Sequence, residues 1–180
     1  MAIGSWLRFA VTAGLLLAPL AADAHGPSRK KEISTIEINA PADKVWAVVG
    51  NYHDMSWHPG IAKTEAADGN EPEVTTRNLT FKSGGVFTDK LTRYEPDNKV
   101  IAFITDVESL KDLPVEGYYS TFTVKGEGGK TTVEWKGAFY RGYVNNDPPP
   151  ELSDEAAIKA VTAFQKEGLE ALKAKLESGG

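Results

Sequence analysis

The strongest constraint on the fold is a run of six strand-like segments placed close together between residues 63 and 141. Short turn sequences such as Ser83-Gly84-Gly85 and Pro96-Asp97-Asn98 separate the segments. Parallel strands would need crossover connections of about a dozen residues or more. The short turns therefore predict an antiparallel meander, with strands at 63–67, 74–81, 86–94, 100–107, 117–125 and 131–141.

A seventh strand and two short helical segments are predicted before this meander. Residues 34–39 alternate with a period of two, which indicates a half-buried strand. Pro41 ends that strand and suits the first position of a helix, which should run to about Val49. The aromatic segment 52–61, which contains Pro59-Gly60, is interpreted as a second short helix or a turn.

The last element is a long amphipathic helix. Ser153 supplies an N-cap, and an apolar stripe wide enough to lie along a sheet continues to about Glu177. Gly168 interrupts the helix and costs about 1 kcal/mol relative to Ala, so we expect either a close packing contact or a gap there. One long helix over a curved antiparallel sheet makes an α+β domain, which we place at residues 32–177.

The first 24 residues have the pattern of a signal peptide. Arg8 precedes an apolar stretch that ends at Leu20, and Ala22-Asp23-Ala24 provides the small residues required at a cleavage site. The apolar stretch is too short for a secure membrane span, since about 20 residues are needed. We expect cleavage after Ala24, a flexible lead-in at 25–31, and export to the periplasm, with no stable membrane insertion after the signal peptide is removed.

Composition excludes several classes of function. The chain has 20 Lys+Arg, 25 Asp+Glu and a net charge of −5, which argues against nucleic-acid binding because that needs clustered cations. The chain has no Cys, so disulfides, thiolate zinc sites, iron–sulfur clusters and a cysteine nucleophile are all excluded. An exported chain without cysteine is more typical of a bacterial periplasm than of a disulfide-stapled secreted domain.

Three stretches carry a resemblance to a known superfamily. They are IEINAPADKVWAVVGNYHDMSWHPGIAKTE at 36–65, PVEGYYSTFTV at 114–124 and TTVEWKGAFYRG at 131–142. The chain resembles the SRPBCC superfamily, which groups START lipid-transfer domains, birch-pollen-type allergens and polyketide cyclases. The resemblance covers residues 32–177 and implies a helix-grip fold. In that fold a seven-stranded curved antiparallel sheet wraps around a long C-terminal helix, with two short helices after strand 1.

A finer resemblance rests on the signal peptide together with NNDPPPELSDEAAIKAV at 145–161. With these features the chain is similar to the MxaD family, periplasmic proteins encoded with methanol dehydrogenase in methylotrophic bacteria. The resemblance implies a role in assisting the interaction or electron transfer between methanol dehydrogenase and its cytochrome c. It implies no catalysis and no cofactor.

Aromatic residues are the candidates for a ligand pocket. The chain has enough rings to line a cavity between the sheet and the helix, although the same rings could simply fill the core. The predicted pocket residues are Trp46, Trp57, His58, Tyr94, Phe103, Tyr118, Phe122, Trp135 and Phe164. Such a pocket would take a small hydrophobic ligand.

The three histidines and the strand carboxylates are weaker candidates. His53 and His58 would point about 140° apart on a helix, and a packing role for His58 in the Trp-His-Pro turn is favoured over metal binding. His25 would become the N-terminal residue after cleavage, but its flexible surroundings argue against a fixed copper site. We therefore predict no metal site. Glu37, Asp106 and Glu134 are interpreted as solvated strand residues, and no catalytic residue is predicted.

Acidic residues beside three prolines form a candidate docking surface. Rigid, exposed acidic residues could bind a basic partner, or could be no more than a solvated cap on the helix. They are Asp147, Glu151, Asp154 and Glu155. Three hypotheses follow from the sequence: a non-enzymatic accessory protein, a carrier of a small hydrophobic ligand, and a cyclase-like enzyme. The third would require His58, Arg93 and Tyr94 to converge in a cavity.

Overall fold

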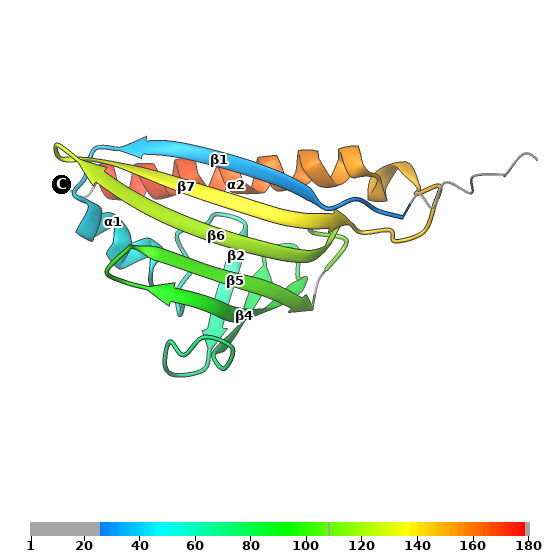
Figure 1. Cartoon of the computed structure of the whole chain (residues 1–180), viewed down its shortest axis with the longest axis horizontal. Helices are drawn as coiled ribbons and strands as arrows, with labels where there is room; N and C mark the ends of the chain where they lie inside the picture. The colour runs from blue at the N-terminus through cyan, green and yellow to red at the C-terminus, as the bar shows by residue number, and fades with distance from the viewer. Residues whose placement is uncertain (1–25, 108, 179–180) are drawn as a thin grey trace, which may run out of the picture.

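A computed structural model describes residues 26–107 and 109–178 of the chain (Figure 1). The predicted signal peptide at 1–24 and His25 lie outside these residues. The elements, in chain order, are β1 (Lys30–Ile38), α1 (Ala42–Val49), β2 (Ile61–Ala66), β3 (Thr76–Phe81), β4 (Val86–Glu95), β5 (Val100–Val107), β6 (Val115–Glu127), β7 (Lys130–Arg141), the one-turn 3-10 helix η1 (Pro150–Leu152) and α2 (Asp154–Ser178).

The seven strands form one antiparallel sheet in the order β1-β7-β6-β5-β4-β3-β2. Each pair from β2 to β7 is joined in sequence by a short connection, as the meander predicted, whereas β1 pairs with β7 from the opposite end of the domain. β1 and β2 are therefore the two edges. The α+β helix-grip fold expected from the sequence is confirmed.

Helix α2 lies along the sheet and packs mainly against β1 and β7 (Figure 1). Ser153 caps it as predicted, since the Ser153 hydroxyl accepts the backbone N–H of Ala156 at 3.2 Å. One face of the helix is fully buried and includes Val161, Leu169 and Leu172. That face supplies one wall of the core. No helix among the described residues is long and apolar enough to cross a membrane.

Alternation along β7 decides which side chains face the helix. Val133, Trp135 and Phe139 are fully buried, while Glu134 points to the other side and stays partly exposed. Glu37 is likewise at the surface, where it accepts a hydrogen bond from Lys130 at 2.7 Å, and Asp106 is exposed. These three carboxylates are solvated, as the strand pattern indicated.

The segment between α1 and β2 is expected from the sequence to form either a second short helix or a turn. It forms a series of turns, so the structure has one short helix after strand 1 and not two. The Asn51 side chain accepts the backbone N–H of His53, and the Asp54 side chain accepts that of Ser56 at 2.7 Å. Such local side-chain bonds give the backbone an alternative to helical hydrogen bonding, and Pro59 prevents a helix from continuing.

Candidate functional site

An enclosed cavity lies between the concave face of the sheet and α2. The space open to the centre of a water-sized sphere is about 10 Å³, which is room for about one water molecule. Six of the lining residues are apolar and four are polar. They are Met55, Leu79, Phe87, Asp89, Phe103, Thr105, Tyr118, Ser120, Trp135 and Phe164.

Interlocked aromatic rings account for the small size of this cavity. The ring of Trp135 lies 4.4 Å from that of Phe122 and 5.3 Å from that of Phe164, measured between centroids. Trp57 meets Trp135 edge-on at 6.3 Å. These separations are those of rings in direct contact. A ligand larger than a water molecule would have to displace some of the rings.

His58 is part of this packing and is fully buried. Its Nδ1 accepts the backbone N–H of Gly60 at 3.0 Å, and its Nε2–H donates to the Phe164 carbonyl oxygen at 2.9 Å. Both ring nitrogens are therefore engaged and the neutral form is selected. Burial lowers the pKa of His58, and the hydrogen bond to Phe164 only partly opposes that effect. The ring has a structural role, as the sequence favoured.

Gly168 explains how α2 comes so close to His58. A Cβ added at Gly168 would lie 2.4 Å from the His58 Cδ2 atom and 3.0 Å from the Trp135 ring. No side chain fits there without movement, because atoms at such distances overlap. Of the two outcomes expected for this glycine, the structure shows the close packing contact.

A buried ion pair forms one side of the cavity. Arg77 donates from Nε and Nη2 to Asp89 Oδ2 at 3.0 and 2.9 Å, and Thr105 donates to Asp89 Oδ1 at 2.8 Å. The guanidinium carbon of Arg77 also lies 4.5 Å from the centroid of Tyr52 and 4.3 Å from that of Phe103. Burial raises the pKa of Asp89, and Arg77 and Thr105 act against that rise. The charges are satisfied by one another, by hydrogen bonds and by aromatic faces.

A second polar group lies on the neighbouring strands. Trp135 Nε1–H donates to the Ser120 hydroxyl at 3.2 Å, and Gln165 of α2 donates to the Tyr118 hydroxyl at 3.2 Å. Burial raises the pKa of Tyr118 to about 12. Gln165 is fully buried and its Oε1 makes no hydrogen bond within the described residues. The hydrogen bond between Gln165 and Tyr118 links α2 to β6 of the sheet.

The predicted pocket residues fall into three places. Four of them line the cavity: Phe103, Tyr118, Trp135 and Phe164. Three more belong to the same buried ring cluster without lining the cavity: Trp57, His58 and Phe122.

Trp46 and Tyr94 lie outside the cavity. Their rings stack at 6.0 Å beside the end of α1, where they line a shallow surface hollow of about 250 Å³ together with Asn51 and Asn70. Arg93 is exposed and bonded to Glu95 at 2.6 Å. The convergence of His58, Arg93 and Tyr94 that a cyclase-like enzyme would require is therefore not formed.

The other sequence candidates are at the surface. His53 bonds through Nε2 to the Ala67 carbonyl oxygen at 3.0 Å, away from the buried His58. Among the residues that the structure describes, no three His, Asp or Glu side chains are grouped to hold a metal ion.

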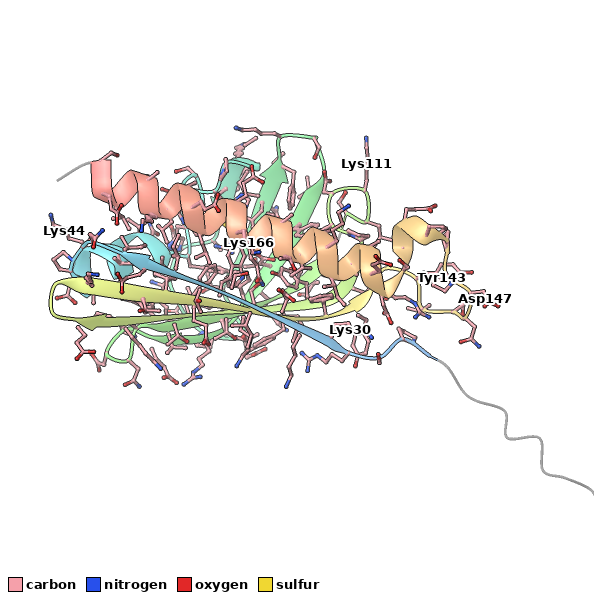
Figure 2. All side chains as sticks on the ribbon, turned by 90° about the horizontal axis from the view of Figure 1, so that it is seen from above. Lys30, Lys44, Lys111, Tyr143, Asp147 and Lys166 are labelled. Atoms are coloured by element: carbon pink, nitrogen blue, oxygen red, sulfur yellow. The ribbon has the colours of Figure 1, made fainter. Side chains whose placement is uncertain are left out.

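Three of the four docking candidates, Asp147, Glu151 and Glu155, are exposed. Figure 2 places Asp147 at the tip of the loop that leads into α2. Asp154 is only partly exposed and pairs with Lys30 at 2.9 Å and with Arg141 at 3.7 Å. Lys30 is thus part of β1 and fixed at its end, although the sequence suggested a flexible lead-in as far as residue 31.

Sequence reasoning missed the buried ion pair. Its signal was nevertheless present, because Asp89 alternates in step with the buried Phe87 and Leu91. Arg77 does the same with Leu79 on β3. An acidic and a basic residue on the inward side of neighbouring strands predict a buried pair, since neither could be buried alone.

Comparison with known proteins supports the fold. A family model described as polyketide cyclase / dehydrase and lipid transport matches residues 33–177. No curated protein sequence matches the chain. The structure is similar to that of XoxI from Bacillus cereus, at 25% identity and a TM-score of 0.68, over 81% of this chain and 94% of that one.

Two further solved structures share the fold at lower identity. A START superfamily protein from Mycobacterium smegmatis has 17% identity and a TM-score of 0.66, over 83% of this chain and 99% of that one. Norcoclaurine synthase from Thalictrum flavum, in complex with dopamine and hydroxybenzaldehyde, has 16% identity and a TM-score of 0.63, over 97% and 99%. At these identities the likeness concerns the fold alone.

Proposed function

We propose that this chain, which belongs to the polyketide cyclase / dehydrase and lipid transport family of the SRPBCC superfamily, is a non-catalytic accessory protein that acts through its surface. The observation that carries the proposal is the closed interior, which has room for about one water molecule. A protein with so little interior space binds larger partners on its outside. The partners that the sequence resemblance implies are methanol dehydrogenase and its cytochrome c, in the periplasm.

The hydrogen bonds of two interior groups also support a non-catalytic role. A general acid or base must reach the proton that it transfers. Both nitrogens of His58 are bonded to the backbone, and the carboxylate of Asp89 is bonded to Arg77 and Thr105. The surface, in contrast, presents exposed acidic residues around the start of α2: Asp147 on the proline-containing loop, Glu151 in η1 and Glu155 in the first turn of α2. These residues suit electrostatic docking to a basic surface.

The test is the rate of electron transfer from methanol dehydrogenase to its cytochrome c, measured with increasing amounts of the purified protein. We expect the rate to change and then saturate near stoichiometric amounts. The effect should fade at high salt, because exposed charges are screened beyond about 10 Å at 0.1 M ionic strength. An unchanged rate at both low and high salt would refute the accessory role.

A charge-matched pair of variants locates the docking surface. The test variant carries Asp147→Asn, Glu151→Gln and Glu155→Gln, which remove three exposed charges. The control variant removes the same charge from exposed positions elsewhere on the surface: Asp68→Asn, Asp97→Asn and Glu127→Gln. The first variant should lose most of the effect and the second should keep it. Equal losses would mean that net charge, and not this surface, is responsible.

A second candidate function is the binding of a small hydrophobic ligand inside the domain. The observation in its favour is the cavity itself, since six apolar side chains surround a few polar groups, as in many ligand sites. Its size requires that the rings of Phe164 and Trp135 move when a ligand enters. Native mass spectrometry of gently purified protein, before and after incubation with a fatty acid or a quinone, tests it. Detection of the ligand-free mass alone would count against a carrier.

A further inference from the structure

The sheet opens between β5 and β6 at one end. The two strands pair from Val100↔Thr123 as far as Ile104↔Tyr119 and no further. Beyond that point β5 stays with β4, and β6 stays with β7, as in the pair Glu116↔Tyr140. The register of β6 shifts between Glu116 and Tyr119, where Gly117 has a φ of +58°, a conformation that favours glycine. The neighbouring strands therefore separate.

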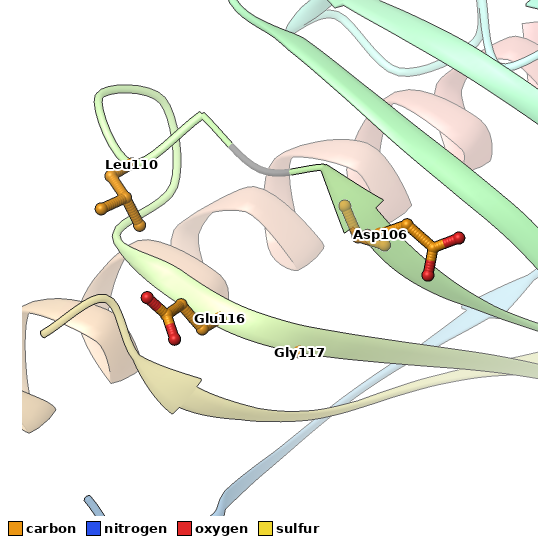
Figure 3. A pocket seen from close by; sticks show the side chains of 5 residues that line it. Asp106, Leu110, Glu116 and Gly117 are labelled. Atoms are coloured by element: carbon orange, nitrogen blue, oxygen red, sulfur yellow. The ribbon is translucent and has the colours of Figure 1, made fainter. Parts of the chain in front are cut away.

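A surface pocket occupies this split. Its volume is about 460 Å³, and Figure 3 shows Asp106 at the end of β5 and Glu116 near the start of β6, on opposite sides of the opening, with α2 passing behind. The lining residues are Thr105, Asp106, Leu110, Glu116 and Gly117. The pocket is thus far larger than the enclosed cavity.

The surface pocket and the cavity share one lining residue. Thr105 lines both the surface pocket and the enclosed cavity, and its hydroxyl donates to Asp89, which is 1% exposed. Tyr118, the residue after Gly117, also lines the cavity. Thr105 is therefore the lining residue that the surface pocket and the cavity have in common.

The rim of the pocket is acidic. Asp106 is exposed, Glu116 is partly exposed, and no Lys or Arg is among the five lining residues. Carboxylates at the mouth of a cleft attract cations and repel anions. The opening should therefore discriminate by charge as well as by size.

We propose that the split between β5 and β6 is the entrance to the enclosed cavity, and that it admits small neutral or cationic molecules in preference to anions. The proposal rests on the second candidate function, in which the interior binds a ligand. It adds the route that the ligand takes and the charge that the route selects.

Cysteine labelling tests the route, because the chain contains no other thiol. Ser120→Cys places a thiol inside the cavity, and methyl methanethiosulfonate, a small neutral reagent, modifies it on contact. Leu110→Trp fills the outer pocket and should slow this modification several-fold. Thr105→Ser removes one methyl group from the shared lining residue, keeps the hydroxyl, and should speed it. Asn98→Cys on an exposed turn is the control, and its rate should not respond to either change.

Charge selectivity is tested at Thr105 itself. Thr105→Cys should react with a cationic aminoethyl reagent about tenfold faster than with an anionic sulfonatoethyl reagent of similar size, relative to the ratio at Asn98→Cys. Adding Asp106→Asn and Glu116→Gln should remove that preference. Circular dichroism confirms that each variant is folded, and Thr105→Cys keeps the test informative if Ser120→Cys does not fold.

Two results would overturn the proposal. One is a modification rate of Ser120→Cys that changes with neither Leu110→Trp nor Thr105→Ser, which would mean that the reagent enters by another route. The other is a charge ratio at Thr105→Cys equal to that at Asn98→Cys. Labelling needs no knowledge of the natural ligand, so a negative result in native mass spectrometry would remove the carrier function without deciding the route.

Discussion

Replacing Gly168 with Ala should destabilise the protein, against the usual effect of that change in a helix. Ala favours a helix interior by about 1 kcal/mol over Gly. Here the new Cβ would lie 2.4 Å from His58 Cδ2 and 2.9 Å from its Nε2. The ring cannot move away freely, because Gly60 and Phe164 hold it by hydrogen bonds at 3.0 and 2.9 Å. Overpacking of this kind costs about 1–3 kcal/mol.

The net change follows from these terms. Loss of one hydrogen bond to His58 adds about 1 kcal/mol to the cost of overpacking. After the gain in helix propensity is subtracted, the free energy of unfolding should fall by about 1–3 kcal/mol. Urea denaturation followed by tryptophan fluorescence measures this change, and the slope of the transition should stay the same.

Two controls isolate the cause. Ala163→Gly, at an exposed position of the same helix, measures the helix propensity alone and should cost about 1 kcal/mol. In a His58→Ala background, Gly168→Ala should become much less costly, because the closest clash is gone and only the 3.0 Å contact with Trp135 remains. The reasoning is refuted if Gly168→Ala stabilises the otherwise unchanged protein by as much as Ala163→Gly destabilises it.

Three other perturbations test the described contacts. Burial lowers the pKa of His58 below its usual 6.5, so the unfolded chain binds a proton first as the pH falls. The free energy of unfolding should therefore have its full value above pH 6.5 and decrease below it. Urea denaturation at several pH values should show a flatter pH dependence of this free energy for His58→Gln. Asp89→Asn alone, which leaves Arg77 buried without its charge partner, should cost about 3–5 kcal/mol, whereas Arg77→Met with Asp89→Leu should cost clearly less in the same denaturation assay. Ser153→Ala should cost about 1 kcal/mol and lower the melting temperature in calorimetry, while Ser153→Asp should change it little.

The strands were predictable because their alternation is set by burial on one face. The pattern placed Trp135 against the helix and Glu134 outside, and turn residues marked most of the connections. The segment 52–60 was harder, since helix and turn depend there on single side-chain bonds from Asn51 and Asp54. Such bonds leave no periodic signal in the sequence.

The site was predictable only in part. Aromatic content predicted a ring-lined cavity, but it could not separate Trp135, which lines the cavity, from Trp46, which stacks on Tyr94 at the surface. The volume of the cavity could not be predicted from the sequence either, because it depends on how closely the rings pack. The split between β5 and β6 results from a register shift and a positive φ at Gly117, which the alternation pattern does not encode.

The pairing of β1 with β7 also determines the order in which the domain can fold. The segments β2 to β7 are neighbours in sequence and need only short loops to close. β1 has no strand partner until β7 exists, so its pairing must wait for most of the chain and closes the longest loop of any strand pair in the sheet. Contacts this distant in sequence slow folding. A chain in which β1 has not yet paired leaves one edge of β7 without its partner strand and the β1-facing side of α2 uncovered, and an unpaired strand edge favours aggregation.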